Sequence, residues 1–302
     1  MTSSSMPARR LAGAAWLLVC ATPCFGQGRA PAGPQAPGVS VAAAYSGREG
    51  FLSRSAGFSA AFPLGEAGGF SYSASAGASH IRFPGRRSFP GELYETHAGL
   101  RAAGKTWSFG ASARSNSDRP FNSPAETDFG LDASRPVGGA GPHRFLFGVS
   151  YSSRRSFLPG LPFPYVSYAY RSETLTLLLP FSARWKFAPG HELAASYHPP
   201  KYFSVSVSRE FSRELTCSVF GGTALSQYLP ADRPDKSHSL FIERPQAGLR
   251  AALSPRPGWT AEVSAAWGLR GYTYEGSRYD DRRGKVSVGS GPEASLSLRR
   301  NF

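Results

Sequence analysis

The chain ends on Lys285–Phe302, KVSVGSGPEASLSLRRNF, in which apolar and polar side chains alternate almost without interruption. A period of two residues places the apolar side chains on one face of a β-strand and the polar ones on the other. Strands of soluble proteins usually have about five or six residues, whereas about nine to eleven tilted residues cross the hydrocarbon layer of a membrane. This stretch therefore predicts the closing strand of a transmembrane barrel.

The N-terminus has the pattern of a secretory signal. Arg9 and Arg10 precede an apolar run over residues 11–21, and a helix-breaking Pro23 follows. We expect residues 1–26 to be a signal peptide, residues 27–38 to be a flexible periplasmic leader rich in Pro and Gly, and residues 39–302 to form the barrel.

Composition and hydropathy narrow the classes further. No other segment reaches about 18 consecutive apolar residues, which excludes a helical membrane protein. The mean hydropathy of -0.28 is compatible with a barrel, because half of each spanning strand faces a polar lumen. Loss of residues 1–26 leaves Cys217 as the one cysteine, so no intramolecular disulfide is expected. A large sheet closed on itself would supply the stability instead.

Alternating runs recur from Val39 to the C-terminus, with no change of composition that would mark a second domain. Residues 70–78 place Phe, Tyr and Ala on one face and mostly Ser on the other. Residues 175–187 keep apolar side chains at odd positions straight through Pro180, where we expect a bulge or an unpaired group because proline lacks an N–H donor. The pattern predicts an all-β, closed, antiparallel up-and-down transmembrane barrel.

The lengths of the connections predict the number of strands. Bacterial barrels have short periplasmic turns and longer outer loops. The connections alternate accordingly, with 46–53, 83–91 and 116–127 long and with 65–69 and 103–105 short. The tallies from the two ends of the chain agree if residues 188–201, which contain three prolines, form an outer loop. The barrel then has about fourteen strands, within a range of about 12–16.

Aromatic residues recur at the ends of the runs, as at Tyr45, Trp107 and Phe211, which is typical of rings at the boundary of water and lipid. The β-propensity of aromatic residues alone would give the same distribution. A soluble β-sandwich also alternates apolar and polar residues, but its strands are shorter and its turns lack a long and short rhythm. A secreted sandwich that binds surfaces is therefore the structural alternative.

Arginine dominates the basic residues. The formal net charge is +14, and the chain has five lysines and 29 arginines. Because the guanidinium binds phosphate and carboxylate in a planar fork, anionic partners are expected. Nucleic acid is not expected, since the arginines are scattered and no recognition motif accompanies them. Codon bias combined with solvated loops is the alternative explanation.

Two groups of arginines are candidate functional residues. Those on polar strand faces would point into the lumen and favour anions: Arg101, Arg114, Arg144, Arg184, Arg250 and Arg270. Those in the expected outer loops would contact glycolipid phosphates of the outer leaflet: Arg86, Arg87, Arg154, Arg155, Arg282 and Arg283. Alternatively, the lumen arginines pair as structural cross-struts that plug the interior, with Glu95, Asp128, Asp132, Glu192, Glu210 and Glu262.

The sequence gives little indication of catalysis. The six histidines form no His-Glu-x-x-His or His-x-His arrangement, so neither a metal nor a cofactor is expected. His97 shares a polar face with Glu95, where a satisfied interior side chain is the simplest interpretation. Asp280 and Asp281 adjoin two arginines and suggest a self-neutralising loop. We therefore do not expect an enzyme, and a membrane-embedded lipid-modifying enzyme is kept as an alternative.

With its signal sequence, repeated amphipathic strands and terminal Phe302, the chain resembles bacterial outer-membrane β-barrel proteins, in particular uncharacterised barrel families without an assigned activity. The likeness covers the whole mature chain and is architectural. In that class the last strand carries the signal read by the barrel-assembly machinery, which implies this role for Ala294, Leu296, Leu298 and Phe302. Arg300 departs from the pattern, since the class usually has an aromatic or aliphatic residue there; an arginine could instead snorkel to the interface.

These features predict a passive pore or small-solute transporter of the bacterial outer membrane with a bias toward anions. The expected partners are outer-membrane lipids and glycolipid phosphates. The resemblance also implies contact with the barrel-assembly machinery and periplasmic chaperones during biogenesis. A monomer is expected. A plugged structural barrel is the main functional alternative.

Overall fold

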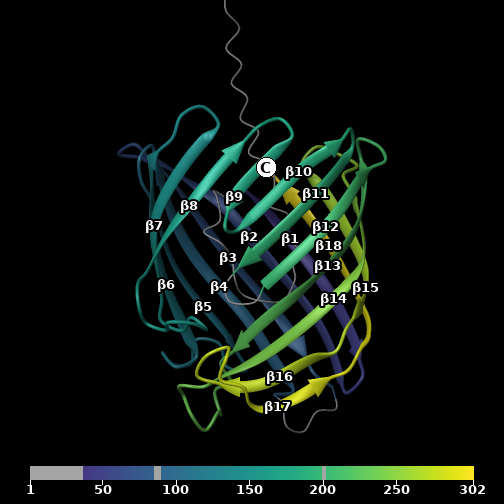
Figure 1. Ribbon diagram of the computed structural model, residues 1–302. Coiled ribbons are helices and arrows are strands. Elements are labelled where there is room, and N and C mark those ends of the chain that lie inside the picture. Colours follow the sequence, from purple (N-terminus) through teal and green to yellow (C-terminus); the bar gives the residue numbers. More distant parts are fainter. Residues whose placement is uncertain (1–36, 85–89, 199–201) are drawn as a thin grey trace, which may run out of the picture.

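The chain folds into a β-barrel in the computed structural model, which describes residues 37–84, 90–198 and 202–302 (Figure 1). The predicted signal peptide and most of the predicted leader lie outside the described residues. The described strands, in chain order, are β1 (Gly38–Arg48), β2 (Phe51–Ala67), β3 (Phe70–Arg82), β4 (Glu92–Gly104), β5 (Ser108–Ser117), β6 (Thr127–Gly138), β7 (His143–Ser152), β8 (Phe163–Arg171), β9 (Leu175–Leu179), β10 (Ser182–Ala188), β11 (His191–His198), β12 (Tyr202–Glu210), β13 (Leu215–Tyr228), β14 (Ser239–Leu253), β15 (Trp259–Gly268), β16 (Gly271–Gly276), β17 (Arg283–Val288) and β18 (Gly291–Asn301).

Sixteen of the described strands form a closed ring. Each strand from β1 to β14 pairs antiparallel with the next one along the chain, and β18 closes the ring by pairing with both β15 and β1. β16 and β17 form a hairpin outside the ring, in which β16 pairs with Ser239–Glu243 of β14. The predicted fold class is confirmed, and the strand number falls within the predicted range.

Two predictions for residues 175–201 are wrong. Residues 175–187 form a hairpin of β9 and β10 instead of one strand. Pro180 has no ladder donor, and the N–H of Phe181 donates to the carbonyl of Leu178 at 2.6 Å, which closes a turn. The described residues 188–198 of the predicted outer loop are not a loop, because β11 pairs with both β10 and β12, and residues 199–201 lie outside the described residues. These extra strands raise the number from about fourteen to sixteen.

Two further boundaries differ from expectation. The predicted long loop at 46–53 is a tight turn, because β1 extends to Arg48 and β2 begins at Phe51. Gly50 supplies the left-handed backbone of this turn, with φ of 67°. The predicted closing strand over 285–302 is interrupted at 289–290, so that β18 closes the barrel while β17 leaves the ring.

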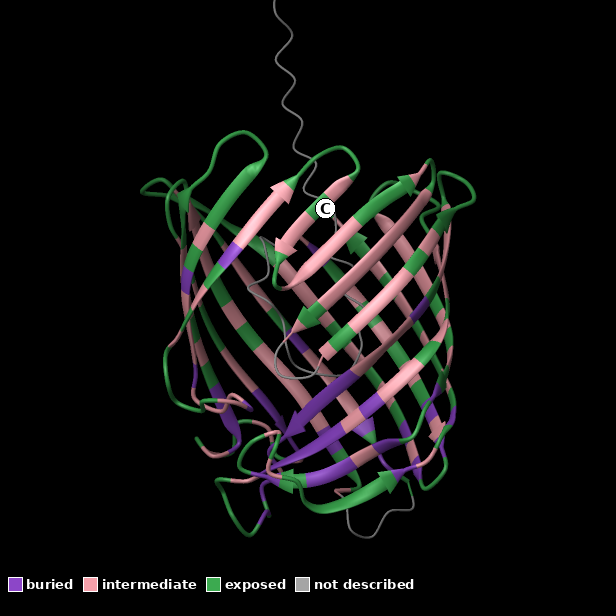
Figure 2. Cartoon of the chain, in the orientation of Figure 1, coloured by how far each residue is buried: buried purple, intermediate pink, exposed green. Residues whose placement is uncertain are grey.

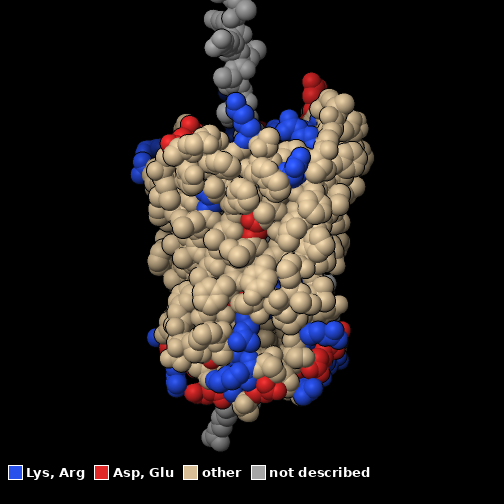
Figure 3. All heavy atoms as spheres, turned by 90° about the vertical axis from the view of Figure 1, so that its left-hand side faces the viewer, with Lys and Arg blue, Asp and Glu red and all other residues tan. Residues whose placement is uncertain are grey.

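The outer surface of the ring is apolar. Large side chains that point away from the lumen, such as Phe58, Leu131 and Leu249, are 58–62% exposed. Figure 3 shows charged side chains concentrated at both ends of the visible face, with a belt of other residues between them. Such a belt matches the acyl chains of a bilayer. Among the described residues, no helix is long and apolar enough to span a membrane.

The two ends of the barrel differ. Gly38 pairs with Asn301 at one end, where the connections are short, as at 68–69 and 105–107. The opposite end carries the longer connections 118–126, 153–162 and 229–238. In bacterial barrels the short turns face the periplasm. Figure 2 shows that buried residues gather at the opposite, extracellular end, together with the hairpin of β16 and β17.

Candidate functional site

Opposite walls of the barrel meet at the extracellular end. A sixteen-strand barrel is about 30 Å across, from a strand spacing of about 4.8 Å and a tilt of about 40°. Nevertheless, the hydroxyl of Tyr228 on β13 donates to Oε1 of Glu95 on β4 at 2.8 Å. Nδ2 of Asn116 on β5 donates to the carbonyl of Gln227 at 3.1 Å, although β5 and β13 are eight strands apart around the ring. The end of β13 therefore bends inward across the mouth.

An apolar cluster fills the same mouth. It combines side chains from β2, β4, the end of β3, β13, β14 and β17, namely Phe51, Ile81, Phe83, Leu93, Tyr228, Leu240, Ile242 and Val288. Leu93 and Val288 are fully buried, so the β16–β17 hairpin closes over the opposite wall. Burying a large apolar side chain stabilises a fold by about 1.5–3 kcal/mol. Packed side chains therefore cross the axial exit in this conformation.

Arg48 anchors the hairpin to the ring. Its Nε donates to Glu293 Oε1 at 2.8 Å, Nη1 donates to the carbonyl of Leu269 at 2.8 Å, and Nη2 donates to the carbonyl of Pro245 at 3.0 Å. Gly268 provides the space, because a Cβ at this position would overlap the guanidinium. One buried cation therefore satisfies the carbonyl exposed where β15 turns into β16, and it also ties β14 and β18 to β1.

The extracellular loops bind one another above the mouth. Glu126 is buried and pairs with Arg233 at 3.4 Å and with Lys236 at 3.6 Å. Nη2 of Arg233 also donates to the carbonyl of Ala125 at 2.7 Å. Burial lowers the pKa of the Arg233 guanidinium, and the Glu126 carboxylate opposes this shift. The 229–238 loop is thus fixed to the 118–126 loop across the barrel.

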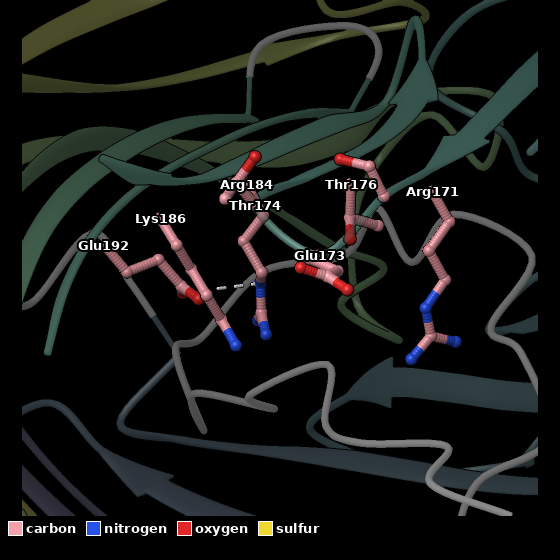
Figure 4. Close-up of a pocket in the computed structure, with 8 residues that line it drawn as sticks. Arg171, Glu173, Thr174, Thr176, Arg184, Lys186 and Glu192 are labelled. Atoms are coloured by element: carbon pink, nitrogen blue, oxygen red, sulfur yellow. Dashed lines mark ion pairs between the residues drawn. The ribbon is translucent and has the colours of Figure 1, made fainter. Parts of the chain in front are cut away.

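The periplasmic end contains a charged cavity of about 510 Å³ (Figure 4). It lies at the β8–β9 turn and along β10 and β11, and is lined by Arg171, Ser172, Glu173, Thr174, Thr176, Arg184, Lys186 and Glu192. Three cations and two carboxylates share this surface. Nε of Arg184 lies 3.5 Å from Oε1 of Glu192. The cavity could therefore bind a small polar solute, with one positive charge in excess.

Three of the predicted lumen arginines form ion pairs between strands. Nε of Arg114 donates to Asp128 at 2.7 Å, Arg184 pairs with Glu192, and Nε of Arg250 lies 3.3 Å from Glu262. In each pair the two residues belong to neighbouring strands. The arrangement matches the cross-strut alternative for these three arginines.

The other three predicted lumen arginines occupy different places. Arg101 flanks Gly110 from one side in the ladder and Asp132 flanks it from the other. The missing Cβ of Gly110 leaves room for the Asp132 carboxylate between the two strands. Arg144 is exposed near the periplasmic start of β7, and Arg270 is exposed between β15 and β16 at the extracellular end. Arg270 therefore lies outside the wall that lines the lumen.

The predicted glycolipid-contacting arginines lie at the extracellular end where they are described; Arg86 and Arg87 fall outside the described residues. Arg154 donates to the carbonyls of Lys236 and Pro124, and Arg155 donates to the carbonyl of Ser150. Arg282 pairs with Glu243, and Arg283 pairs with Asp281. Each of these four side chains binds within the protein, and contact with lipid phosphates stays a prediction.

The predicted assembly-signal residues share one face of the C-terminal strand. Leu296, Leu298 and Phe302 are exposed on the outside of the barrel, and Ala294 lies on the same face. The guanidinium of Arg300 lies 5.3 Å from the ring centre of Trp259 and 5.1 Å from that of Phe302. This stacking explains how an arginine occupies a position between apolar neighbours. Recognition by an assembly machinery remains a prediction.

The candidate catalytic residues form no reactive constellation. His97 lies opposite Arg114 in the β4–β5 ladder. Asp280 pairs with Arg278, as Asp281 does with Arg283, so the loop neutralises itself as expected. Within the described ranges, no group of three or more His, Cys, Asp or Glu residues could hold a metal ion.

Sequence reasoning missed the residues that close the mouth. Arg48 and Tyr228 were not singled out, although both occupy inward positions in their strands. Their inward positions follow from the alternation in the sequence. Their hydrogen-bond partners, Glu293 and Glu95, lie 245 and 133 residues away in the chain. Lys186 in the charged cavity was also missed, although it shares the inward parity of Arg184 on the same strand.

Comparisons with known proteins give only remote likenesses. No family model matches the chain, and no curated protein matches it. Among solved structures, an outer membrane channel from Pseudomonas putida F1 is similar with a TM-score of 0.37 and 8% identity, over 90% of this chain and 97% of that one. A variant of the Rh. blastica porin has a TM-score of 0.34 and 10% identity, over 89% and 99%. TM-scores and sequence identities this low do not indicate an activity. The closed ring and its apolar belt, taken by themselves, identify an outer-membrane β-barrel.

Proposed function

We propose that the protein is an outer-membrane channel for small anionic solutes that is held closed at its extracellular end. The contacts across the mouth, led by the bond from Tyr228 to Glu95, carry this proposal. A permanently open porin would have no need for a bond between strands that are seven positions apart around the ring. A barrel with a polar entrance and a packed exit instead has an open and a closed conformation, and the contacts at the exit stabilise the closed one.

The bias toward anions rests on the periplasmic cavity. Arg171, Arg184 and Lys186 face two carboxylates there, and the Arg184–Glu192 pair neutralises one charge of each sign. Figure 4 shows Lys186 and Arg184 projecting side by side. A positive lining lowers the barrier for anions and raises it for cations. The ion pairs deeper in the wall contribute less to the preference for anions, because carboxylates already neutralise Arg114 and Arg250.

Conductance in planar lipid bilayers tests the closed state. Replacing Tyr228→Phe removes the hydroxyl and leaves the Glu95 carboxylate without this donor. A buried group left unsatisfied costs about 1–3 kcal/mol, so the open probability should rise at least about fivefold. Tyr151→Phe, on the lipid face of β7, is the matched control and should behave like the unmodified protein.

Ion selectivity tests the bias. In the Tyr228→Phe background, a KCl gradient should give a reversal potential that reports preference for chloride. Lys186→Glu should shift that potential toward cations, because it changes the local charge by two units. Lys285→Glu is the control, since Lys285 stacks on Tyr272 in the extracellular hairpin, away from the entrance.

A plugged structural barrel is the second candidate. The packed mouth and the paired wall arginines favour it as well. If neither the unmodified protein nor Tyr228→Phe conducts after verified insertion, the channel proposal fails and the structural role replaces it.

A further inference from the structure

The shortest strands of the wall are neighbours in the ring. β9 to β12 have between five and nine residues, whereas β13 and β14 have 14 and 15. At about 3.3 Å per residue, β9 spans about 16 Å and β13 about 46 Å. Figure 1 shows that the arrows of β9 to β12 cover the periplasmic part of the wall and stop well above its extracellular end.

The short strands leave two strand segments with a partner on one side. β9 pairs with β8 from Tyr168 onward, so Phe163–Ser167 pairs with β7 alone within the described residues. In the same part of the chain, β12 pairs with β13 as far as Thr223, and Ala224–Tyr228 pairs with β14 alone. We call the interruption between these two segments the wall break.

Aromatic rings line the periplasmic edge of the wall break. The ring centres of Tyr165 and Phe181 are 6.2 Å apart, those of Phe181 and His198 are 6.5 Å apart, and those of His198 and Tyr202 are 5.4 Å apart. The row runs from β8 through the β9–β10 turn to β11 and β12. On the bilayer side, Val166 is 63% exposed. The edge therefore offers an apolar surface, in contrast to the serine-rich lumen wall.

The charged cavity lies nearer the periplasm, on β9, β10 and β11 and at the β8–β9 turn. Arg184 lies on β10, three residues after Phe181 in the β9–β10 turn. Three residues correspond to about 10 Å along a strand. Lys186 lies farther from the wall break again. The cations lie nearer the periplasm and the aromatic rings lie at the edge of the wall break. This order would fit a molecule with an anionic head and an apolar chain at least about 10 Å long.

The β7–β8 loop crosses the extracellular part of the wall break as a strap. Its Arg154 carbonyl accepts from Nε2 of Gln227 on β13 at 3.0 Å. Its Ser156 carbonyl accepts from the N–H of Tyr279, in the tip of the extracellular hairpin, at 3.1 Å. The loop also exposes Leu158 and Leu161. These two hydrogen bonds, together with those from the Arg154 guanidinium to the carbonyls of Lys236 and Pro124, hold this strap in place.

We propose that an anionic amphiphile, a fatty carboxylate, passes between the lumen and the outer leaflet through the wall break when the strap lifts. The inference rests on the proposed channel function and names a substrate class and a second route for it. Packed side chains cross the axial mouth, whereas the wall break interrupts the hydrogen-bonded wall beside the lumen rings. The carboxylate would bind at Arg184 and Lys186, with its chain along Tyr165 and Phe181.

A reversible lock on the strap tests the route. Ser156→Cys and Tyr279→Cys, introduced with Cys217→Ser, place two thiols beside an existing backbone hydrogen bond, a separation suited to a disulfide. Hexadecanoate with a diazirine on its chain is supplied within vesicle bilayers that contain the protein. After a brief flash, mass spectrometry gives the initial rate of labelling at each site.

The oxidised protein should label at Tyr165, Phe181 and Tyr202 at least tenfold more slowly than the same protein after reduction. Labelling at the lipid-facing Leu249 should be equal in both states and serves as the internal control. Equal lumen labelling in the two states would overturn the lateral route. Since both states share one folded protein, a folding defect cannot mimic the effect.

The head-group site is tested with a charged and a neutral probe. Arg184→Gln combined with Lys186→Gln should weaken labelling by hexadecanoate at least fivefold and leave labelling by a diazirine-bearing hexadecanol unchanged. Arg209→Gln, a surface arginine stacked on Phe211, is the control. Equal loss for both probes would exclude recognition of the carboxylate.

Chloride conductance separates this inference from the channel proposal. Tyr228→Phe in the oxidised, strap-locked background should still conduct, because the disulfide joins the strap to the tip of the hairpin and leaves the mouth without the Tyr228–Glu95 bond in either state. Conductance with lock-independent lipid labelling would overturn the lateral route alone. Lock-dependent labelling without conductance would overturn the axial channel alone.

Discussion

Two residues on the same face of β14 lie in opposite environments. Leu249, in the periplasmic part, is 62% exposed toward the bilayer, whereas Phe241, eight residues nearer the extracellular end, is fully buried. Phe241 packs with Leu225 and Tyr274, beneath the tip of the β16–β17 hairpin. One alternating pattern thus builds a lipid-facing wall in one half of the barrel and a packed, loop-covered closure in the other. The comparison shows that an outward position in a barrel strand does not by itself mean contact with lipid.

The largest difference in stability between the two halves is expected when a buried charged side chain is removed. Arg48→Ala removes one donor from Glu293 and one from each of two carbonyls, and loss of one partner of a buried ion pair costs about 3–5 kcal/mol. Urea unfolding in phospholipid vesicles, followed by tryptophan fluorescence, measures the change. Arg54→Ala, at an exposed position of β2, should change the free energy of unfolding by less than about 0.5 kcal/mol. Equal effects would contradict an anchoring role for Arg48.

The next effect concerns apolar packing. Phe241→Ala creates a cavity and should cost about 3–4 kcal/mol in the same unfolding assay. Phe58→Ala removes a ring that is 59% exposed on the lipid face of β2, where acyl chains can fill the space, and should cost less than about 1 kcal/mol. If Phe58→Ala lowered the free energy of unfolding as much as Phe241→Ala, the two halves would be packed alike.

A smaller effect is expected at a single neutral hydrogen bond across the mouth. Asn116→Ala removes the donor to the Gln227 carbonyl and should destabilise the barrel by about 1 kcal/mol. Asn122→Ala, in the exposed 118–126 loop, is the matched control. In single-channel recordings, the Asn116 variant should also open more often. An unchanged opening frequency would show that this bond does not hold the mouth closed.

The smallest effect is a pH dependence confined to the extracellular hairpin tip. The N–H of Ser277, which donates to the Asp281 carboxylate, lowers the pKa of that group below its usual value. Because the folded pKa is depressed, this stabilisation is fully present above the usual pKa of 3.8 and is lost as the pH falls through the lower folded value. The amide shift of Ser277 in NMR spectra should therefore change below pH 3.8. Asp281→Asn should abolish the change, and a midpoint at or above 3.8 would refute the assignment.

The sequence predicted the long, regular strands well, and it predicted the short strands β9 to β12 and the extracellular closure poorly. The alternation that ends in Leu296, Leu298 and Phe302 was enough to assign the closing strand, because the membrane imposes the same two-sided environment along it. The hairpin at Pro180 was misassigned, since Leu177, Leu179 and Phe181 continue the same parity through a turn. Of the candidate arginines, Arg101, Arg114, Arg184 and Arg250 lie at inward positions of their strands, but periodicity carries no information on which carboxylate each one meets.

Local alternation, the apolar belt and the antiparallel closed sheet were determined by the order of residues alone, because each strand must satisfy lipid on one side and water on the other wherever it crosses the bilayer. The closed mouth, the wall break and the charged entrance were decided by the tertiary structure. They depend on contacts such as Tyr228 with Glu95 and Arg48 with Glu293, between residues far apart in the chain. Strand curvature and strand length, which bring those residues together, follow from packing of the whole ring and leave no local period in the sequence.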